Sequence, residues 1–418
     1  MRRALLFALL VCVAVAAQTP KDVRNAAKQG QTGIPALARF LTSPSLDTRI
    51  EAVRQLTATG GKDTVDPLLR ATKDADAEVQ MRATDGLVNY YLPGYVKQGI
   101  GSTVVRAGSA IRAKFGEVNE QTIDAWVMVR PEVVAALGQL ARGGSSMDSR
   151  ANACRALGIL RGRAAAPDVV EALRSKDNNV MLEGLVALRK IGDPQYGPRV
   201  TYLLRDLDDK VQGAAIETAG ILRSEEALPT LRTMVTNPRN NKSQRAALAA
   251  IAMMPAKEDR GLFSGLLSAK DDKQRALAAE GLGRLGGDVA VLERLWKDEE
   301  KMAPRLAAAF GLVLNGQVAT SDEAPLRYLL NTLNSGAWRE TAVAYLSEAL
   351  RKDNVRNAVY PVAEQGTRSE KTGLALVLAA SGDAASIPSL EKLSHDADDV
   401  VAQEGLRALR SLKARLGN

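Results

Sequence analysis

The sequence predicts an all-α fold, a right-handed α-solenoid of about eleven stacked antiparallel helix pairs. Three observations support this prediction. A segment with two small or apolar residues four positions apart recurs every 30 to 34 residues over most of the chain. Hydrophobic residues make up 46% of the chain but aromatic residues only 4%, which suits helices packed through small side chains. Turn residues divide each period into two apolar helices, and such a pair must stack on its neighbours to bury both faces.

The first 17 residues are typical of a secretory signal peptide. A short basic start precedes an apolar run that ends in small residues, and the run is shorter than the roughly 20 residues that span a bilayer. We expect cleavage after Ala16 or Ala17 and export to the periplasm or medium, with no integral membrane span in the mature chain. Cys12 leaves a lipid-anchored form open, although the bulky Val11 before it disfavours that processing.

Charge and cysteine content limit the mature chain further. Removal of the leader leaves Cys154 as the only cysteine, so no intramolecular disulfide can form even in an oxidising compartment. Loss of Arg2 and Arg3 lowers the formal charge from +8 to +6. This charge is small for the length and is not gathered into a basic tail, so we expect no nucleic-acid partner.

The helices follow in order along the chain. Residues 21–29 predict a first helix, and residues 34–41 a second one with Pro35 in its first turn. Later second helices are expected at 167–173, 228–235, 289–296 and 387–393. The paired positions that mark successive first helices are Ala52 and Leu56, Ala83 and Leu87, Ala153 and Leu157, Gly184 and Leu188, Ala215 and Ala219, Leu248 and Ala252, Ala278 and Leu282, Ala308 and Leu312, Ala342 and Leu346, Leu374 and Leu378, and Gly405 and Leu409.

The repeats share an Asp before the first helix, an Arg at its start, small residues in its middle and Leu-Gly near its end. Residues 148–158 and 272–283 carry this pattern well. The pattern resembles the short HEAT-like repeat of bacterial proteins, of the phycobilin-lyase-like type, from about Gly33 to Leu416. The resemblance implies that second helices line the inner curved surface. Low aromatic content argues against tetratricopeptide repeats, and the lack of Thr-Pro-Leu-His argues against ankyrin repeats.

Residues 88–130 interrupt the repeats and are predicted to be an insertion in the solenoid. Leu87 and Leu157 are 70 residues apart, about eight more than two periods, and residues 102–115 predict an amphipathic helix. One interpretation is a degenerate repeat packed in a new place, and the other is a flap that borders the groove and contacts a partner. Candidate partner-binding residues in this insertion are Tyr90, Tyr91, Tyr95, Arg106, Arg112 and Trp126.

A second set of candidates is a row of arginines near the ends of successive second helices. If second helices line the inner surface, Arg142, Arg174 and Arg205 form a basic ladder there that binds an acidic partner. The alternative is a structural role, because cations are favoured at helix C-termini and an Asp follows Arg174 and Arg205 by three residues, close enough to pair.

Residues for catalysis are expected to be absent. HEAT-like deoxyhypusine hydroxylase needs paired His-Glu iron ligands, and this chain has His395 alone. Residues 281–286 match a loose dinucleotide fingerprint but end a repeat helix and follow no strand. Cys154 lies on the apolar face of its helix, so we interpret it as a small buried hydrophobe. We therefore predict no catalytic, cofactor-binding or metal-binding residues.

Together these observations predict a non-catalytic protein–protein interaction scaffold or adaptor in the bacterial cell envelope. It would bind a protein partner along the concave face of the solenoid, with residues 88–130 as a second candidate contact surface. The alternatives are an enzyme or cofactor-binding member of the HEAT-like lyase group, and a regulatory subunit of an envelope enzyme. The sequence does not predict the partner's identity or the oligomeric state.

Overall fold

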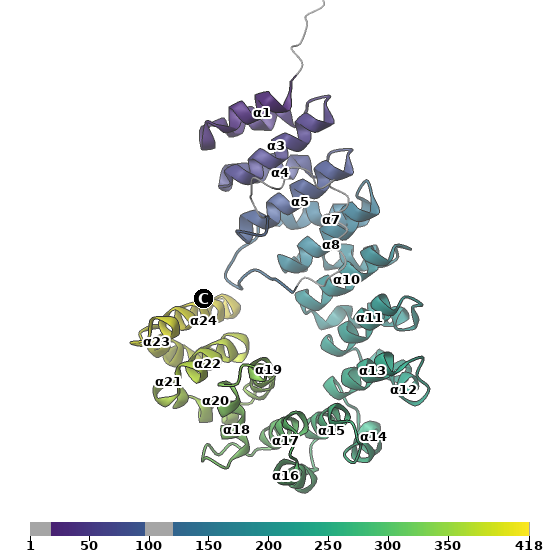
Figure 1. Cartoon of the computed structure of the whole chain (residues 1–418), viewed down its shortest axis with the longest axis vertical. Coiled ribbons are helices and arrows are strands. Elements are labelled where there is room, and N and C mark those ends of the chain that lie inside the picture. The colour runs from purple at the N-terminus through teal and green to yellow at the C-terminus, as the bar shows by residue number, and fades with distance from the viewer. Residues whose placement is uncertain (1–17, 97–119, 418) are drawn as a thin grey trace, which may run out of the picture.

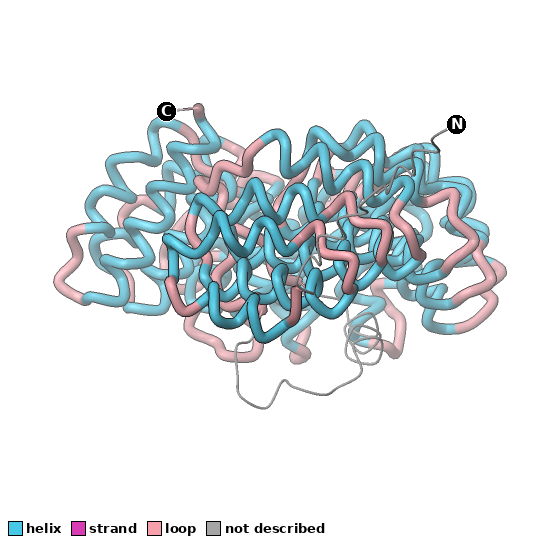
Figure 2. Tube along the Cα trace, turned by 90° about the horizontal axis from the view of Figure 1, so that it is seen from above, coloured by secondary structure: helices cyan, strands magenta, loops and turns pink. Residues whose placement is uncertain are grey.

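The computed structural model describes residues 18–96 and 120–417. Within these ranges the regular structure is helical and no strand occurs. Eleven helix pairs and one final helix stack side by side into a strongly curved arc (Figure 1). Figure 2 shows the same stack from above, with loops joining the helices at their ends. This arrangement confirms the predicted all-α solenoid.

Each pair consists of a first helix and a shorter second helix. The first helices, with the final helix last, are α1 (Pro20–Ala27), α3 (Leu46–Thr59), α5 (Ala77–Tyr91), α8 (Met147–Ile159), α10 (Asn178–Ile191), α11 (Asp209–Ile221), α13 (Asn241–Met253), α15 (Asp272–Leu285), α17 (Met302–Leu314), α19 (Arg339–Ala349), α22 (Arg368–Ser381) and α24 (Asp399–Leu416). The second helices are α2 (Ile34–Phe40), α4 (Val65–Ala71), α7 (Pro131–Gly143), α9 (Ala166–Ala172), η4 (Pro194–Arg205), α12 (Leu228–Thr236), α14 (Arg260–Leu266), α16 (Val289–Asp298), α18 (Pro325–Thr332), α20 (Asp353–Val359) with α21 (Val362–Gln365), and α23 (Ile387–Ser394). Short 3₁₀ turns precede several of them, namely η1 (Gly30–Gly33), η2 (Lys62–Thr64), η3 (Arg163–Ala165), η5 (Glu225–Ala227), η6 (Lys257–Asp259) and η7 (Ala384–Ser386).

The repeating Asp of the sequence pattern starts the first helices. Its carboxylate accepts hydrogen bonds from backbone N–H groups that have no partner inside the helix. Asp177 caps α10 in this way and Asp208 caps α11. These are the two residues expected to pair with Arg174 and Arg205. Their carboxylates instead serve the helix that follows.

The repeating Arg joins one pair to the next where the repeat carries it. Its guanidinium donates a hydrogen bond to a carbonyl group at the end of the preceding second helix, which lacks a partner in its own helix. The bonds run from Arg49 to the Ser43 carbonyl oxygen at 3.0 Å, from Arg275 to Ala269 at 2.8 Å and from Arg339 to Leu333 at 2.7 Å. The Arg in the motif is therefore a structural link between repeats.

Small residues let neighbouring first helices approach closely. Gly283 of α15 faces Gly311 of α17, and a Cβ atom added to Gly283 would lie 2.4 Å from the Gly311 Cα. Gly281 packs against the ring of Phe263 in the same way. The segment that resembled a dinucleotide fingerprint is thus a helix contact surface. Cys154 is fully buried in α8, and burial together with the nearby charge of Glu183 raises the pKa of its thiol to about 12.

The first helices form the inner layer of the arc and the second helices form the outer layer. Helices α12, α14, α16 and α23 lie on the outside in Figure 1, whereas α13, α15, α17, α19 and α24 face inward. Side chains of α15 and α19 meet across the inner side, where Arg284 bonds Glu348 although 64 positions separate them. The expectation that second helices line the inner surface is therefore wrong. Close packing at Gly283 and Gly311 brings the first helices together and places the curvature on their side.

The insertion lies between the two helices of one pair, since α5 ends at Tyr91 and α7 begins at Pro131. The predicted signal peptide 1–17, the expected helix 102–115, and the candidates Arg106 and Arg112 lie outside the described residues. Among the helices that are described, none is both long enough and apolar enough to cross a membrane.

Candidate functional site

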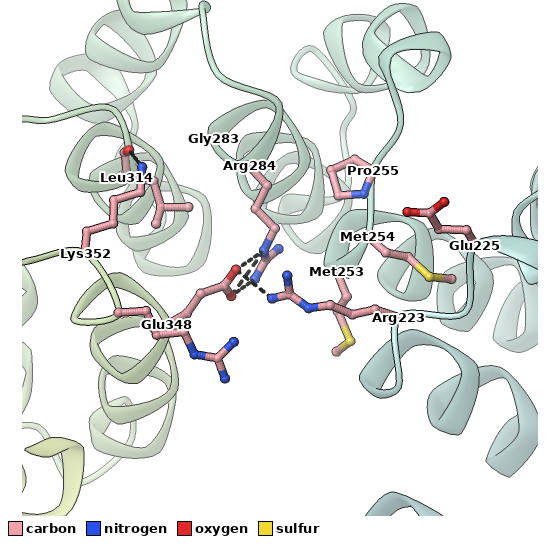
Figure 3. A pocket seen from close by; sticks show the side chains of 11 residues that line it. Arg223, Glu225, Met253, Met254, Pro255, Gly283, Arg284, Leu314, Glu348 and Lys352 are labelled. Atoms are coloured by element: carbon pink, nitrogen blue, oxygen red, sulfur yellow. Dashed lines mark hydrogen bonds and ion pairs between the residues drawn. The ribbon is translucent and has the colours of Figure 1, made fainter. Parts of the chain in front are cut away.

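A pocket of about 430 Å³ opens on the inner surface, near the C-terminal ends of α11, α13, α15, α17 and α19 (Figure 3). It combines four cationic side chains with two carboxylates. We call it the cationic pocket. The charged lining residues are Arg223, Arg284, Arg351, Lys352, Glu225 and Glu348, and the apolar part of the wall comes from Met253, Met254, Pro255 and Leu314.

Arg284 and Glu348 form the fixed centre of this pocket. Arg284 Nε donates to Glu348 Oε1 at 3.0 Å, and Arg284 Nη2 donates to Glu348 Oε2 at 2.8 Å. A third donor, Nη1, reaches Glu280 Oε2 at 2.9 Å. Burial alone would lower the pKa of Arg284, but the bonds and charges of Glu348 and Glu280 outweigh it and raise that pKa. Burial would raise the pKa of Glu348, and the bonds from Arg284 and Arg223 outweigh this and lower it.

Arg284 lies over the ring of Phe310, which in turn stacks on Tyr345. The rings of Phe310 and Tyr345 are stacked, with centroids 4.4 Å apart, and the Arg284 guanidinium carbon lies 5.0 Å from the Phe310 centroid. The Tyr345 hydroxyl donates to Glu280 Oε1 at 2.6 Å. Because a planar guanidinium can bond carboxylates and stack on a ring at once, Arg284 is held rigidly.

The remaining cations keep hydrogen-bond donors unused. Arg223 Nη2 donates to Glu348 Oε1 at 3.1 Å, and the Lys352 ammonium donates to the Leu314 carbonyl oxygen. Arg351 is exposed, and within residues 18–96 and 120–417 its guanidinium has no hydrogen-bond or ion-pair partner. Since a guanidinium carries five N–H donors, the pocket has donors and positive charge left for an anionic group.

A shallow groove of about 440 Å³ lies next to the cationic pocket, between α10, α11 and α13. We call it the apolar groove. Its floor is made of small residues of α11 and α13, and Met253 belongs to both the groove and the pocket. Charged residues of both signs stand along its edges. The floor consists of Gly213, Ala214, Ala246, Ala249 and Ala250, and the edges include Arg189, Asp209, Lys210, Glu217 and Lys242.

Residues 120–124, at the end of the insertion, contact α8, α10 and α24. Arg189 of α10 donates to Glu120 at 2.6 Å, and the Ile123 N–H donates to the Ile159 carbonyl oxygen of α8 at 3.0 Å. Asp124 reaches Arg407 of α24 at 2.6 Å. The stretch thus ties the N-terminal half of the solenoid to its last helix, beside the apolar groove.

Sequence comparison identifies the repeat. The pattern that defines HEAT repeats matches residues 134–207 and 187–252. Residues 134–252 therefore contain HEAT repeats. Among curated proteins, no sequence is significantly similar to the whole chain.

Several solved structures resemble the HEAT solenoid. A protein of Escherichia coli, YibA, is 17% identical with a TM-score of 0.40, over 70% of this chain and 95% of that one. Human deoxyhypusine hydroxylase with glycerol is 18% identical with a TM-score of 0.27, over 68% and 96%. The complex of CpcE and CpcF of phycocyanin lyase from Nostoc sp. PCC7120 is 19% identical with a TM-score of 0.36, over 63% and 91%. At these scores the likenesses carry no inference about activity or ligands.

Three of the four aromatic residues predicted to bind a partner in the insertion 88–130 pack against other parts of the chain. The Tyr91 hydroxyl accepts a hydrogen bond from the Arg130 N–H at 3.1 Å, which joins the two ends of the insertion. Tyr90 packs edge-on against Tyr91, with ring centroids 4.8 Å apart. Tyr95 packs against the core, and burial raises its pKa. Trp126 is half-buried like the three tyrosines, but unlike them it does not pack against the hydrophobic core of the described chain.

The predicted arginine ladder does not lie on the inner surface. Arg142 of α7 forms an ion pair with Asp168 of α9 at 2.7 Å, and Arg174 pairs with Glu171 one turn earlier at 3.1 Å. Arg205 is exposed at the end of η4. All three belong to second helices or their ends, and these helices form the outer layer.

The part of the chain that the structure describes contains no cluster of metal ligands. No group of three or more His, Cys, Asp and Glu side chains is arranged to hold an ion there. His395 is exposed at the end of α23, where its Nδ1 lies 2.8 Å from the Glu391 carbonyl oxygen. This contact is a helix-end hydrogen bond.

Proposed function

We propose that the chain is a non-catalytic scaffold that binds a protein partner on its inner surface. The observation that carries this proposal is the continuity of the apolar groove and the cationic pocket, which meet at Met253. A groove with an apolar floor and charged edges suits a polypeptide, which can place an apolar side chain on the floor and polar groups along the edges. The formal charge of +8 over 418 residues is too small to favour a nucleic acid.

The compartment is part of the proposal. The basic, apolar and small-residue order of residues 1–17 supports export, so the scaffold would act in the cell envelope or outside the cell. N-terminal sequencing of the protein purified from the periplasmic fraction tests this step. A mature chain that begins at Ala17 or Gln18 is expected, and an uncleaved cytoplasmic chain would contradict it.

Site-specific photo-crosslinking tests the binding surface. A photoreactive residue at Ala249, on the floor of the groove, should crosslink to one partner protein in envelope extracts. The matched control carries the same residue at Thr233, which is exposed on the outer helix α12. Equal crosslinking from Thr233, or none from Ala249, would contradict binding on the inner surface.

Absorption spectroscopy and metal analysis of the purified chain test the lyase-like alternative. A scaffold is expected to carry neither a chromophore nor a stoichiometric metal. One equivalent of either would replace the scaffold proposal with a cofactor-dependent function.

A further inference from the structure

We infer that the apolar groove and the cationic pocket together bind an acidic peptide segment, in which an aliphatic side chain lies a few residues from a carboxylate. The inference rests on the proposed function and specifies the chemistry of the partner. The aliphatic side chain enters the groove, and the carboxylate enters the pocket.

The groove can admit a side chain because its floor carries no side chain larger than a methyl group. A Cβ atom added to Gly213 would meet nothing within 4 Å, so the space above the backbone of α11 is open. Ala246 and Ala249 of α13 form the opposite side and are only partly buried. An aliphatic side chain placed there would cover apolar surface that now faces solvent, which favours binding.

The pocket suits a single negative charge. Arg223, Arg284, Arg351 and Lys352 contribute four positive charges, and Glu225 and Glu348 contribute two negative ones. The carboxylate of Glu280 bonds Arg284 from behind and leaves an excess of about one charge. One carboxylate of a partner balances this excess. The two negative charges of a phosphate group would exceed it, and the carboxylates of Glu225 and Glu348 would repel them.

The donors for that carboxylate are already oriented. Glu348 binds both Arg284 and Arg223 and so fixes their guanidinium groups beside each other (Figure 3). Arg351 lines the same pocket. Guanidinium groups bind carboxylates through charge-assisted hydrogen bonds. Because the Arg351 guanidinium has no partner among the described residues, its charge is not needed to hold that part of the fold.

The two sites are adjacent, so one short segment can occupy both. Met253 lines each of them, and its flexible thioether side chain can adapt to different apolar groups. Arg189, on the α10 side of the groove, is already paired with Glu217 and Glu120. The cationic pocket gathers four cations, so we assign the acid to it.

The test uses the mature full-length chain and fluorescein-labelled nonapeptides, with binding followed by fluorescence anisotropy. Each peptide carries one Leu and one Asp at a separation of two to six residues. One matched peptide has Asn in place of Asp, and another has Ser in place of Leu. We expect at least one Asp peptide to bind about tenfold more tightly than each of its matched peptides.

Variants assign the two halves of the segment to the two sites. Arg351→Glu should weaken the Asp peptide about tenfold and leave the Asn peptide unchanged. Gly213→Trp should fill the groove and remove the preference for Leu over Ser. The matched controls are Arg205→Glu and Gly265→Trp, which change an exposed Arg and an exposed, uncrowded Gly of the outer layer. Circular dichroism shows whether each variant keeps its helices.

Equal affinity of the Asp and Asn peptides, or equal effects of the inner and outer variants, would overturn the inference. The crosslinking experiment separates this failure from failure of the scaffold proposal. If a partner still crosslinks from Ala249 in the Arg351→Glu and Gly213→Trp variants, the acidic segment is ruled out and the scaffold remains. If nothing crosslinks from Ala249 while the acidic peptide binds, the scaffold proposal fails and the peptide site remains.

Discussion

Asp124 and Arg407 are 283 positions apart in the chain, yet Arg407 Nη2 lies 2.6 Å from Asp124 Oδ1. The pair joins the insertion to the last helix, α24, and brings the two arms of the solenoid together (Figure 1). Its side chains are 55% and 34% exposed, so water and salt screen the attraction. Such a pair can set the shape of a flexible arc while contributing little to its stability.

Asp124→Asn is expected to widen the arc. An exposed ion pair stabilises a protein by at most about 1 kcal/mol, so the free energy of unfolding should change little, whereas the radius of gyration from small-angle X-ray scattering should increase. High salt should widen the wild type in the same way and have no added effect on the variant. Glu364→Gln is the control, because Glu364 pairs with Lys392 within neighbouring repeats. An unchanged radius in Asp124→Asn would show that other contacts hold the arms.

The fold could be predicted because the same local sequence pattern recurs many times along the chain. Many periods repeat the same local features, namely a capping side chain, a linking Arg and small contact residues, as Asp177, Arg275 and Gly283 illustrate. These are local contacts between residues at fixed spacing. Local contacts do not decide which helices form the inner layer of the arc. That choice depends on how closely successive first helices approach, which the spacing of the repeats does not contain.

The candidate site could not be predicted for the same reason. Arg223, Arg284 and Glu348 come from three different repeats, and each looks in sequence like an ordinary charge on a solvated helix face. They meet only because the arc curves enough to bring α11, α15 and α19 together. Gly213 in the middle of α11 gave a weak signal, because a glycine inside a helix lowers its stability.

Two glycine substitutions should act in opposite directions. Gly283→Ala places a Cβ atom 2.4 Å from the Gly311 Cα, so α15 and α17 must separate, and we expect a loss of about 1–3 kcal/mol in the free energy of unfolding. Gly213→Ala meets open space, and the better helix propensity of Ala should stabilise α11 by about 0.5–1 kcal/mol. Urea denaturation of both variants measures the difference. Equal effects would show that helix propensity, and not the close approach, decides the result at Gly283.

The Glu348 carboxylate is expected to stabilise the arc only when it is ionised. The structure lowers its pKa, so the stabilisation is present above the unfolded-state pKa of about 4.3 and is lost as the pH falls through the lower folded-state pKa. Glu348→Gln should therefore lower the free energy of unfolding by about 2 kcal/mol at pH 7. The difference between variant and wild type should shrink as the pH approaches 3.

Glu323→Gln provides the matched control for this pH experiment, because Glu323 is exposed in a loop and forms no ion pair in the described chain. Its effect should be small at every pH. A wild-type advantage over Glu348→Gln that persists unchanged at pH 3 would show that the shape of the side chain matters there and its charge does not.

Cys154 is expected to report local unfolding of α8. Its side chain is fully buried and its thiol pKa is raised to about 12, so at pH 8 almost no reactive thiolate is present. Ellman's reagent should therefore react with the native mature chain slowly, and at once in denaturant, with one thiol per chain. The Arg155→Lys variant removes the planar guanidinium that bonds Glu183 beside this thiol, so it should speed the reaction by loosening α8 against α10. A fast reaction of the native wild type would mean that α8 opens readily. A second thiol would mean that Cys12 is retained and that the leader is not removed as proposed.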